Sequence, residues 1–164
     1  MSTGMLSDGE MKRIADFDSA SGKLFCSIPD HLLMVLSTSS EGRVSSRTMS
    51  VVVIGDRFLF QTDRRMLKCR QILSNPQVAL CAGNLQVEGV CTMLGVPTES
   101  PAFAHAYKAC FPGSYDRYSA FQDERVFEVV PSFIQRWVYE DDVPFIERFD
   151  MHGQRYVKEQ YRLS

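Results

Sequence analysis

Three strand-length segments separated by short turns constrain the fold of this chain more than any other feature. Residues 31–38, 43–54 and 57–62 have the length and apolar content of β-strands, and Glu41-Gly42 and Gly55-Asp56 fall between them. Turns this short join neighbouring antiparallel strands, whereas parallel strands need crossovers of a dozen or more residues. We therefore expect these segments to pair as antiparallel neighbours.

Four further strand patterns occur later in the chain, at residues 78–85, 87–96, 126–130 and 133–139. Pro131, between the last two, indicates a sheet edge or a bulge. Because the chain has seven or so strands and only short helices, we expect a mainly β protein. An antiparallel barrel fits this pattern better than a doubly wound sheet.

Helices are expected at three places. Ser7-Asp8-Gly9-Glu10 has the form of a capping box, and the helix that it starts is expected to end near residues 19–22. Asp63 can cap a second helix over residues 64–74. A third helix begins at Ser100-Pro101, with proline at the first helical position.

One domain is expected from the whole chain. It consists of an N-terminal helical arm over residues 1–30, a barrel over residues 31–140 and a tail over residues 141–164 that packs on the barrel. Within the tail, residues 145–151 and 154–161 fit either a hairpin or a strand followed by a helix.

Charge and composition exclude several classes of function. The chain has 18 Lys and Arg against 20 Asp and Glu, so its net charge is −2, and it has no broad basic face for nucleic acid or an anionic membrane. It has no apolar run near the ~18 residues of a membrane span and no signal-peptide core, so we expect a cytoplasmic protein. The five cysteines form no Cys-x-x-Cys pair and are expected to be reduced, mostly buried thiols.

Arg47 is the first candidate binding residue. Residues two apart in a strand share a face, so Arg47 lies on the same side as Val51 and Val53, which belong in the core. A guanidinium drawn inward needs an anion, and a phosphate accepts its two-pronged hydrogen bonds well. An ion pair with one of the chain's own carboxylates, or a solvated strand end, would explain the same pattern.

The helix after Asp63 is the second candidate, because Arg64, Lys68 and Gln71 lie on its polar side. Free N–H groups at its N-terminus could join Lys68 and Thr62 around one phosphate. Asp63 would compete for those N–H groups, and a solvated helix face is the alternative interpretation.

The three histidines, His31, His105 and His152, are isolated in the sequence. None has metal-ligand spacing or an obvious nucleophile partner. The chain also has no Walker phosphate loop, Rossmann fingerprint or nucleophile elbow. We therefore predict no metal site and name no catalytic residue.

An ordered set of short motifs resembles the pyridoxamine 5'-phosphate oxidase-related, FMN-binding split-barrel superfamily over about residues 31–137. The motifs are a strand ending in Leu-Ser-Thr, a glycine turn, Arg47-Thr48-Met49, Phe60-Gln61-Thr62, Lys68, Asn75-Pro76-Gln77-Val78-Ala79-Leu80 and Gln86-Val87-Glu88-Gly89. Each motif is weak alone, and their order and spacing carry the likeness.

The resemblance implies a six-stranded antiparallel Greek-key split barrel that forms a homodimer with FMN at the subunit interface. It further implies that Arg47 and Lys68 hold the flavin phosphate and that the backbone at Thr48 and Met49 lies beside the flavin ring. The other implied contacts are Gln61, Thr62 and Gln86.

The resemblance also implies a flavin-dependent oxidoreductase that moves electrons from a reduced nicotinamide to a small acceptor. A flavin-binding stress or sensor protein without turnover is the alternative, and a haem or deazaflavin binder on the same barrel is a weaker one. Two positions depart from the family pattern. Met66 replaces a common serine, and the last residues lack the Arg-Leu-His-Asp-Arg type segment of true pyridoxamine phosphate oxidases, so vitamin B6 oxidation is not expected.

Overall fold

The computed structural model describes residues 7–162, which form a mainly β structure. The strands are β1 (His31–Ser40), β2 (Arg43–Ile54), β3 (Arg57–Asp63), β4 (Gln77–Ala82), β5 (Leu85–Met93), β6 (Glu124–Glu140), β7 (Val143–Asp150) and β8 (Arg155–Gln160). The helices are α1 (Asp8–Ser27), α2 (Leu67–Ser74), the 3₁₀ turn η1 (Pro97–Glu99), α3 (Pro101–Cys110) and α4 (Pro112–Tyr118).

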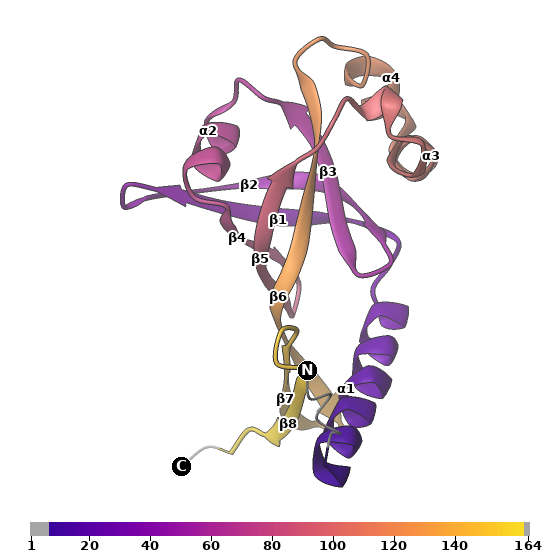
Figure 1. Ribbon diagram of the computed structural model, residues 1–164, viewed down its shortest axis with the longest axis vertical. Helices are drawn as coiled ribbons and strands as arrows, with labels where there is room; N and C mark the ends of the chain where they lie inside the picture. The colour runs from indigo at the N-terminus through magenta and orange to yellow at the C-terminus, as the bar shows by residue number, and fades with distance from the viewer. Residues whose placement is uncertain (1–6, 163–164) are drawn as a thin grey trace, which may run out of the picture.

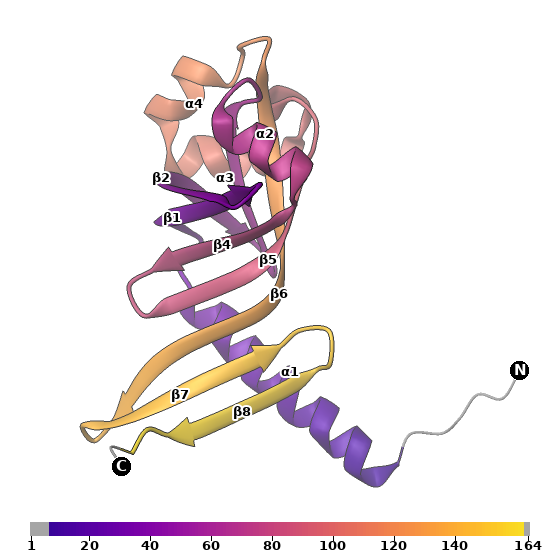
Figure 2. The same ribbon diagram turned by 90° about the vertical axis from the view of Figure 1, so that its left-hand side faces the viewer.

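Six of the strands close into a barrel. The sheet order is β3-β2-β1-β4-β5-β6-β7-β8, every pairing is antiparallel, and β3 also pairs with β6. The β3–β6 pairing closes the six strands from β1 through β6 into a Greek-key barrel. The predicted six-stranded barrel is confirmed. Strands β7 and β8 extend the sheet below the barrel, with α1 alongside them (Figures 1 and 2).

Alternating side chains explain how the strands fill the barrel. In β1, Met34 and Leu36 point inward and are fully buried, whereas Leu33 and Val35 point outward and are exposed. A second apolar cluster lies outside the barrel wall, where Phe103 and Tyr107 of α3 pack against β2, β3 and β6. Where α3 covers the barrel, both faces of its wall are therefore buried.

Strand β6 is one continuous element, so the prediction of two strands over residues 126–130 and 133–139 was wrong. The β5–β6 register shifts between Glu88 and Gly89, and Gly89 lies opposite Pro131. The missing N–H of proline is tolerated at such an irregularity. A Cβ on Gly89 would lie 2.4 Å from the Val130 carbonyl oxygen, so only glycine allows the strands this close.

Helix α1 begins after Ser7 as predicted, but it continues to Ser27 and does not end near residues 19–22. Its buried Phe17 and Leu24 pack on the core. Gly22 lies between them and costs about 1 kcal/mol in a helix interior, which this packing offsets. Pro29 follows the helix end.

The other helices and the tail depart from expectation in smaller ways. Helix α2 begins at Leu67, not Arg64. The additional helix α4 begins at Pro112. The tail forms a hairpin, β7–β8, which settles the two alternatives for its conformation. No helix within residues 7–162 is both long and apolar enough to cross a membrane.

Candidate functional site

The barrel opens where β2 and β3 separate. These strands pair only beside their connecting turn, from Ile54–Arg57 to Val52–Leu59. Farther from the turn, β2 pairs only with β1 and β3 pairs only with β6. Helix α2 follows β3 and packs against β1 at this end of the barrel (Figure 1). Five of the predicted binding residues lie on the separated parts of β2 and β3, and Lys68 lies on α2.

Arg47 points to the inner side of β2, as strand alternation predicted. It pairs with Leu36, whose side chain is fully buried, and its guanidinium is half-buried. The Nη1 group donates hydrogen bonds to Thr38 Oγ1 (2.6 Å) and to the Leu36 carbonyl oxygen (3.3 Å). Among residues 7–162, no carboxylate forms an ion pair with Arg47, so the salt-bridge alternative is wrong for the described part of the chain. Burial lowers the pKa of this guanidinium from its usual value.

Buried Gln71 of α2 extends this arrangement into a small polar network. Thr38 donates from Oγ1 to Gln71 Oε1 (2.7 Å), and Gln71 Nε2 donates to the Arg43 carbonyl oxygen (3.2 Å). The sequence placed Gln71 on the polar side of this helix but connected neither Gln71 nor Thr38 with Arg47, because only the packing of α2 on β1 brings them together. The network holds the guanidinium beneath α2.

Lys68 is half-buried in the first turn of α2 and forms no hydrogen bond or ion pair within the described residues. Burial lowers the pKa of its ammonium group, and the nearby Arg47 guanidinium lowers it further. Two cations therefore lie close together, and neither is neutralised by a direct carboxylate partner.

Asp63 does not cap α2, contrary to the prediction. Its carboxylate accepts hydrogen bonds from the Arg65 backbone N–H (2.8 Å) and from the Arg65 guanidinium (2.6 Å). The Arg65 contacts hold the pKa of Asp63 at about 2. Met66 occupies the N-cap position without a side-chain hydrogen bond. The competition from Asp63 for the helix N–H groups is therefore absent.

Gln61 and Thr62 are buried neighbours on β3 that face opposite sides of the wall. Gln61 Oε1 accepts a hydrogen bond from Ser119 Oγ (2.7 Å), whereas Gln61 Nε2 is buried without an acceptor. A buried donor without a partner costs roughly 1–3 kcal/mol. This orphaned group is a structural sign of a missing acceptor.

Thr48, Met49 and Gln86 divide between the two faces. Met49 is half-buried on the inner side, and Thr48 is exposed on the outer side of β2. Thr48 pairs with Val35, Val35 with Cys81, and Cys81 with Gln86, so Thr48 and Gln86 lie in one row across the sheet. Three strand spacings, or about 14 Å, separate them. Gln86 Nε2 donates to Glu88 Oε1 (2.7 Å). The fold of the single chain therefore does not bring Gln86 to Arg47 and Lys68.

Glu124, which sequence reasoning missed, is a buried carboxyl group at the start of β6. It lies opposite Asp63 in the β3–β6 pair. Burial raises the pKa of Glu124 to about 7; the Asp63 charge raises it as well, whereas Lys68 opposes the change. The only signal in the sequence was an acidic residue before a strand, which is common. Glu124 can hold or release a proton near neutral pH.

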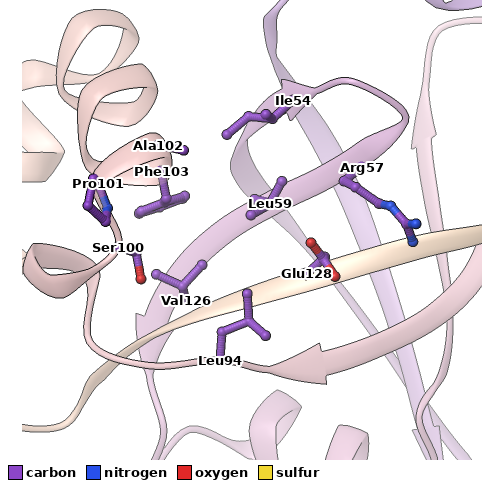
Figure 3. Close-up of a pocket in the computed structure, with 10 residues that line it drawn as sticks. All are labelled: Ile54, Arg57, Leu59, Leu94, Ser100, Pro101, Ala102, Phe103, Val126 and Glu128. Carbon is purple, nitrogen blue, oxygen red and sulfur yellow. The ribbon is translucent and has the colours of Figure 1, made fainter.

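Two of the five cysteines are buried, Cys69 next to Lys68 on α2 and Cys91 on β5, whereas Cys26 and Cys81 are exposed, so the expectation of mostly buried thiols was wrong. Burial raises the pKa of Cys69 to about 11 and that of Cys91 to about 12, so both thiols are unreactive near neutral pH. A pocket of about 260 Å³ lies outside the barrel wall between the start of α3 and strands β3 and β6, with Leu59, Phe103 and Val126 around it (Figure 3). None of the predicted binding residues lines this pocket.

Comparisons with known proteins agree with this architecture. Residues 22–138 match the family described as pyridoxamine 5'-phosphate oxidase. A pyridoxine/pyridoxamine 5'-phosphate oxidase from Acidothermus cellulolyticus is 29% identical over 124 residues, which cover 74% of this chain and 54% of that protein. The chain thus spans about half the length of this curated relative.

Two solved structures show the same fold at low sequence identity. General stress protein 26 from Bacillus anthracis has a TM-score of 0.58 and 20% identity, covering 88% of this chain and 98% of that one. A pyridoxamine 5'-phosphate oxidase-related, FMN-binding protein from Nostoc punctiforme has a TM-score of 0.56 and 13% identity, covering 98% and 100%. From the family match and the closed six-stranded barrel, the chain belongs to the pyridoxamine 5'-phosphate oxidase family and has its split-barrel fold.

Proposed function

We propose that this protein binds FMN and holds the flavin phosphate between Arg47 and Lys68. The observation that carries the proposal is the pair of half-buried cations without carboxylate partners at the end of the barrel. Burying unpaired cations is costly unless an anion joins them. A phosphate accepts the forked N–H groups of arginine and the point charge of lysine.

Two other features of the same region support a phosphorylated flavin. The N-terminus of α2 has no side-chain cap and no acidic residue in its first turn, which favours a nearby anion. Gln61 lies on the outer side of β3 with Leu59, and its orphaned Nε2 offers a donor to a carbonyl or ring nitrogen of a ligand that reaches that side. Thr48, Met49 and Thr62 complete the proposed contacts along the separated strands.

A titration of flavin-free protein with FMN tests this binding. Arg47→Ala should weaken the affinity by roughly tenfold to a hundredfold, the range of a hydrogen bond to a charged group. Arg43→Ala is the matched control, because Arg43 lies on the same strand but is exposed. Unchanged affinity in Arg47→Ala, or an equal loss in both variants, would place the phosphate elsewhere. Retention of haem or a deazaflavin instead of FMN would replace the proposed ligand.

We further propose that the protein is a flavin-dependent oxidoreductase that takes electrons from a reduced nicotinamide. FMN supplies hydride and single-electron chemistry when bound, and the protein supplies binding and orientation. Arg47 and Lys68 would fix the phosphate end, while Glu124 could hold or release a proton near neutral pH. Steady-state oxidation of NADH and NADPH by FMN-loaded protein tests the activity. Turnover no faster than that of free FMN would leave a flavin-binding protein without catalysis.

We also propose a homodimer formed through the outer face of β1, β2, β4 and β5. In Figure 2, β4 and β5 run across the front of the barrel with no helix over them, whereas α3 covers the outer side of β2 around Val52. Leu33, Val35 and Val44 are exposed on this face. A second copy would cover them and could bring its Gln86 toward the flavin.

The free cysteines favour a reducing, cytoplasmic location.

Sedimentation velocity with Val35→Lys tests the dimer. Val157→Lys on β8 is the control, since Val35 and Val157 are similarly exposed, at 41% and 43%. The first variant should sediment as a monomer and the second as a dimer. A wild-type protein that is monomeric with FMN bound would contradict the proposed interface.

A further inference from the structure

Three metal-binding residue types meet at the end of the barrel opposite to α2. Asp30 and His31 lie at the start of β1, and Cys110 is the last residue of α3. A carboxylate oxygen, an imidazole nitrogen and the thiol sulfur all lie within 4.8 Å of one another. The sequence hid this cluster, because about 80 residues separate Cys110 from the other two.

The fold positions each of the three residues without help from a metal ion. The Asp30 carbonyl oxygen accepts a hydrogen bond from the Val53 N–H (2.7 Å), which fixes the chain just before β1. The His31 ring packs edge-on against Phe111, with 5.6 Å between ring centroids and an interplanar angle of 86°. His31 Nδ1 lies 2.7 Å from Asp30 Oδ1. Cys110 ends α3, where the helix dipole favours a positive charge.

We propose that Asp30, His31 and Cys110 bind a zinc ion. A thiolate, an imidazole and a carboxylate form a mixed set that suits Zn²⁺ and excludes the hard cations Mg²⁺ and Ca²⁺. Ligand atoms in a tetrahedral zinc site lie roughly 3.3–3.6 Å apart, so the thiol must approach by about 1 Å and the 2.7 Å contact between Asp30 and His31 must open slightly. Exposed side chains of Asp30 and His31 can make such movements.

Charge and coordination number define the character of the site. The thiolate and the carboxylate together neutralise Zn²⁺, and the thiol proton is released to solvent on binding. Three protein ligands leave one coordination position open to water or to another molecule. The zinc site is separate from the proposed flavin site: His31 pairs with Val52, five residues or about 17 Å along β2 from Arg47.

Cobalt(II) substitution tests the proposal directly in reduced, flavin-free protein. Equimolar Co²⁺ should produce a thiolate-to-cobalt charge-transfer band together with tetrahedral visible bands, and Zn²⁺ should displace it. Cys110→Ser should abolish the charge-transfer band, and His31→Gln should weaken Zn²⁺ binding, measured by calorimetry, at least tenfold. Cys26→Ser and Cys81→Ser are the controls, because both of these cysteines are exposed but lie outside the cluster.

The controls should bind Co²⁺ and Zn²⁺ like the wild-type protein. Absence of the charge-transfer band in the wild type, or its persistence in Cys110→Ser, would overturn the proposal. Equal losses in Cys26→Ser would show adventitious thiol binding and would overturn it as well. Circular dichroism of each variant separates lost ligation from lost folding, and the outcome does not depend on whether FMN binds.

Discussion

Replacing Glu124 with glutamine should remove a pH dependence of folding that the buried carboxyl group imposes. Glu124 has a pKa of about 7 in the folded chain against 4.5 ordinarily. Between these values the folded chain keeps a proton that the unfolded chain has lost. Stability therefore falls as pH rises through this window. The whole shift corresponds to about 3 kcal/mol, present as a penalty above pH 7 and absent below about pH 4.

Urea denaturation of flavin-free protein measures this effect. Between about pH 5 and about pH 8, the wild-type unfolding free energy should fall by roughly 2–3 kcal/mol more than that of Glu124→Gln. Glu128→Gln is the matched control on the same strand, because Glu128 is only half-buried. It should retain the wild-type pH dependence. If Glu124→Gln also retained it, the carboxyl group would not be held in a desolvated environment and our description of this region would be wrong.

Three further outcomes follow from the structure. Lys68→Met should weaken FMN binding several-fold at low salt and less at high salt, because screening reduces a Coulombic contribution; a loss that titrations show to be independent of salt would indicate altered helix packing instead. Gln61→Leu should change the unfolding free energy by less than about 1 kcal/mol, since it removes the orphaned donor together with the Ser119 hydrogen bond. The same variant should bind FMN more weakly. Strong destabilisation with normal FMN affinity would contradict this prediction. Glu147→Ala should cost roughly 3–5 kcal/mol in urea denaturation, because it leaves the Arg136 guanidinium, now 2.5 Å from the carboxylate, without its partner; a cost below about 1 kcal/mol would refute that account.

Local patterns in the sequence predicted the parts of the fold that depend on local physics. The two-residue period of β2 placed Arg47 on the same side as Val51, and the structure confirms that orientation. The turns at Glu41-Gly42 and Gly55-Asp56 defined the first three strands, because both glycines adopt the positive φ that such turns require. These features need no knowledge of distant contacts.

Features that depend on distant contacts were missed or misplaced. The bulge expected at Pro131 is present, but two separate strands were predicted there, whereas Gly89 on the neighbouring strand allows β6 to continue past it. Asp63 fits a helix cap by sequence, yet Arg65 takes its carboxylate. Glu124 became notable only when the β3–β6 pairing buried it.

The most direct test of the proposed phosphate site compares FMN with riboflavin, which lacks the phosphate. Wild-type protein should bind FMN at least tenfold more tightly than riboflavin, because each charge-assisted contact contributes about 1.5–3 kcal/mol. In the double variant Arg47→Ala, Lys68→Ala the two flavins should bind with similar, weak affinity. Equal affinities in the wild type, or an FMN preference that survives in the double variant, would contradict the central claim.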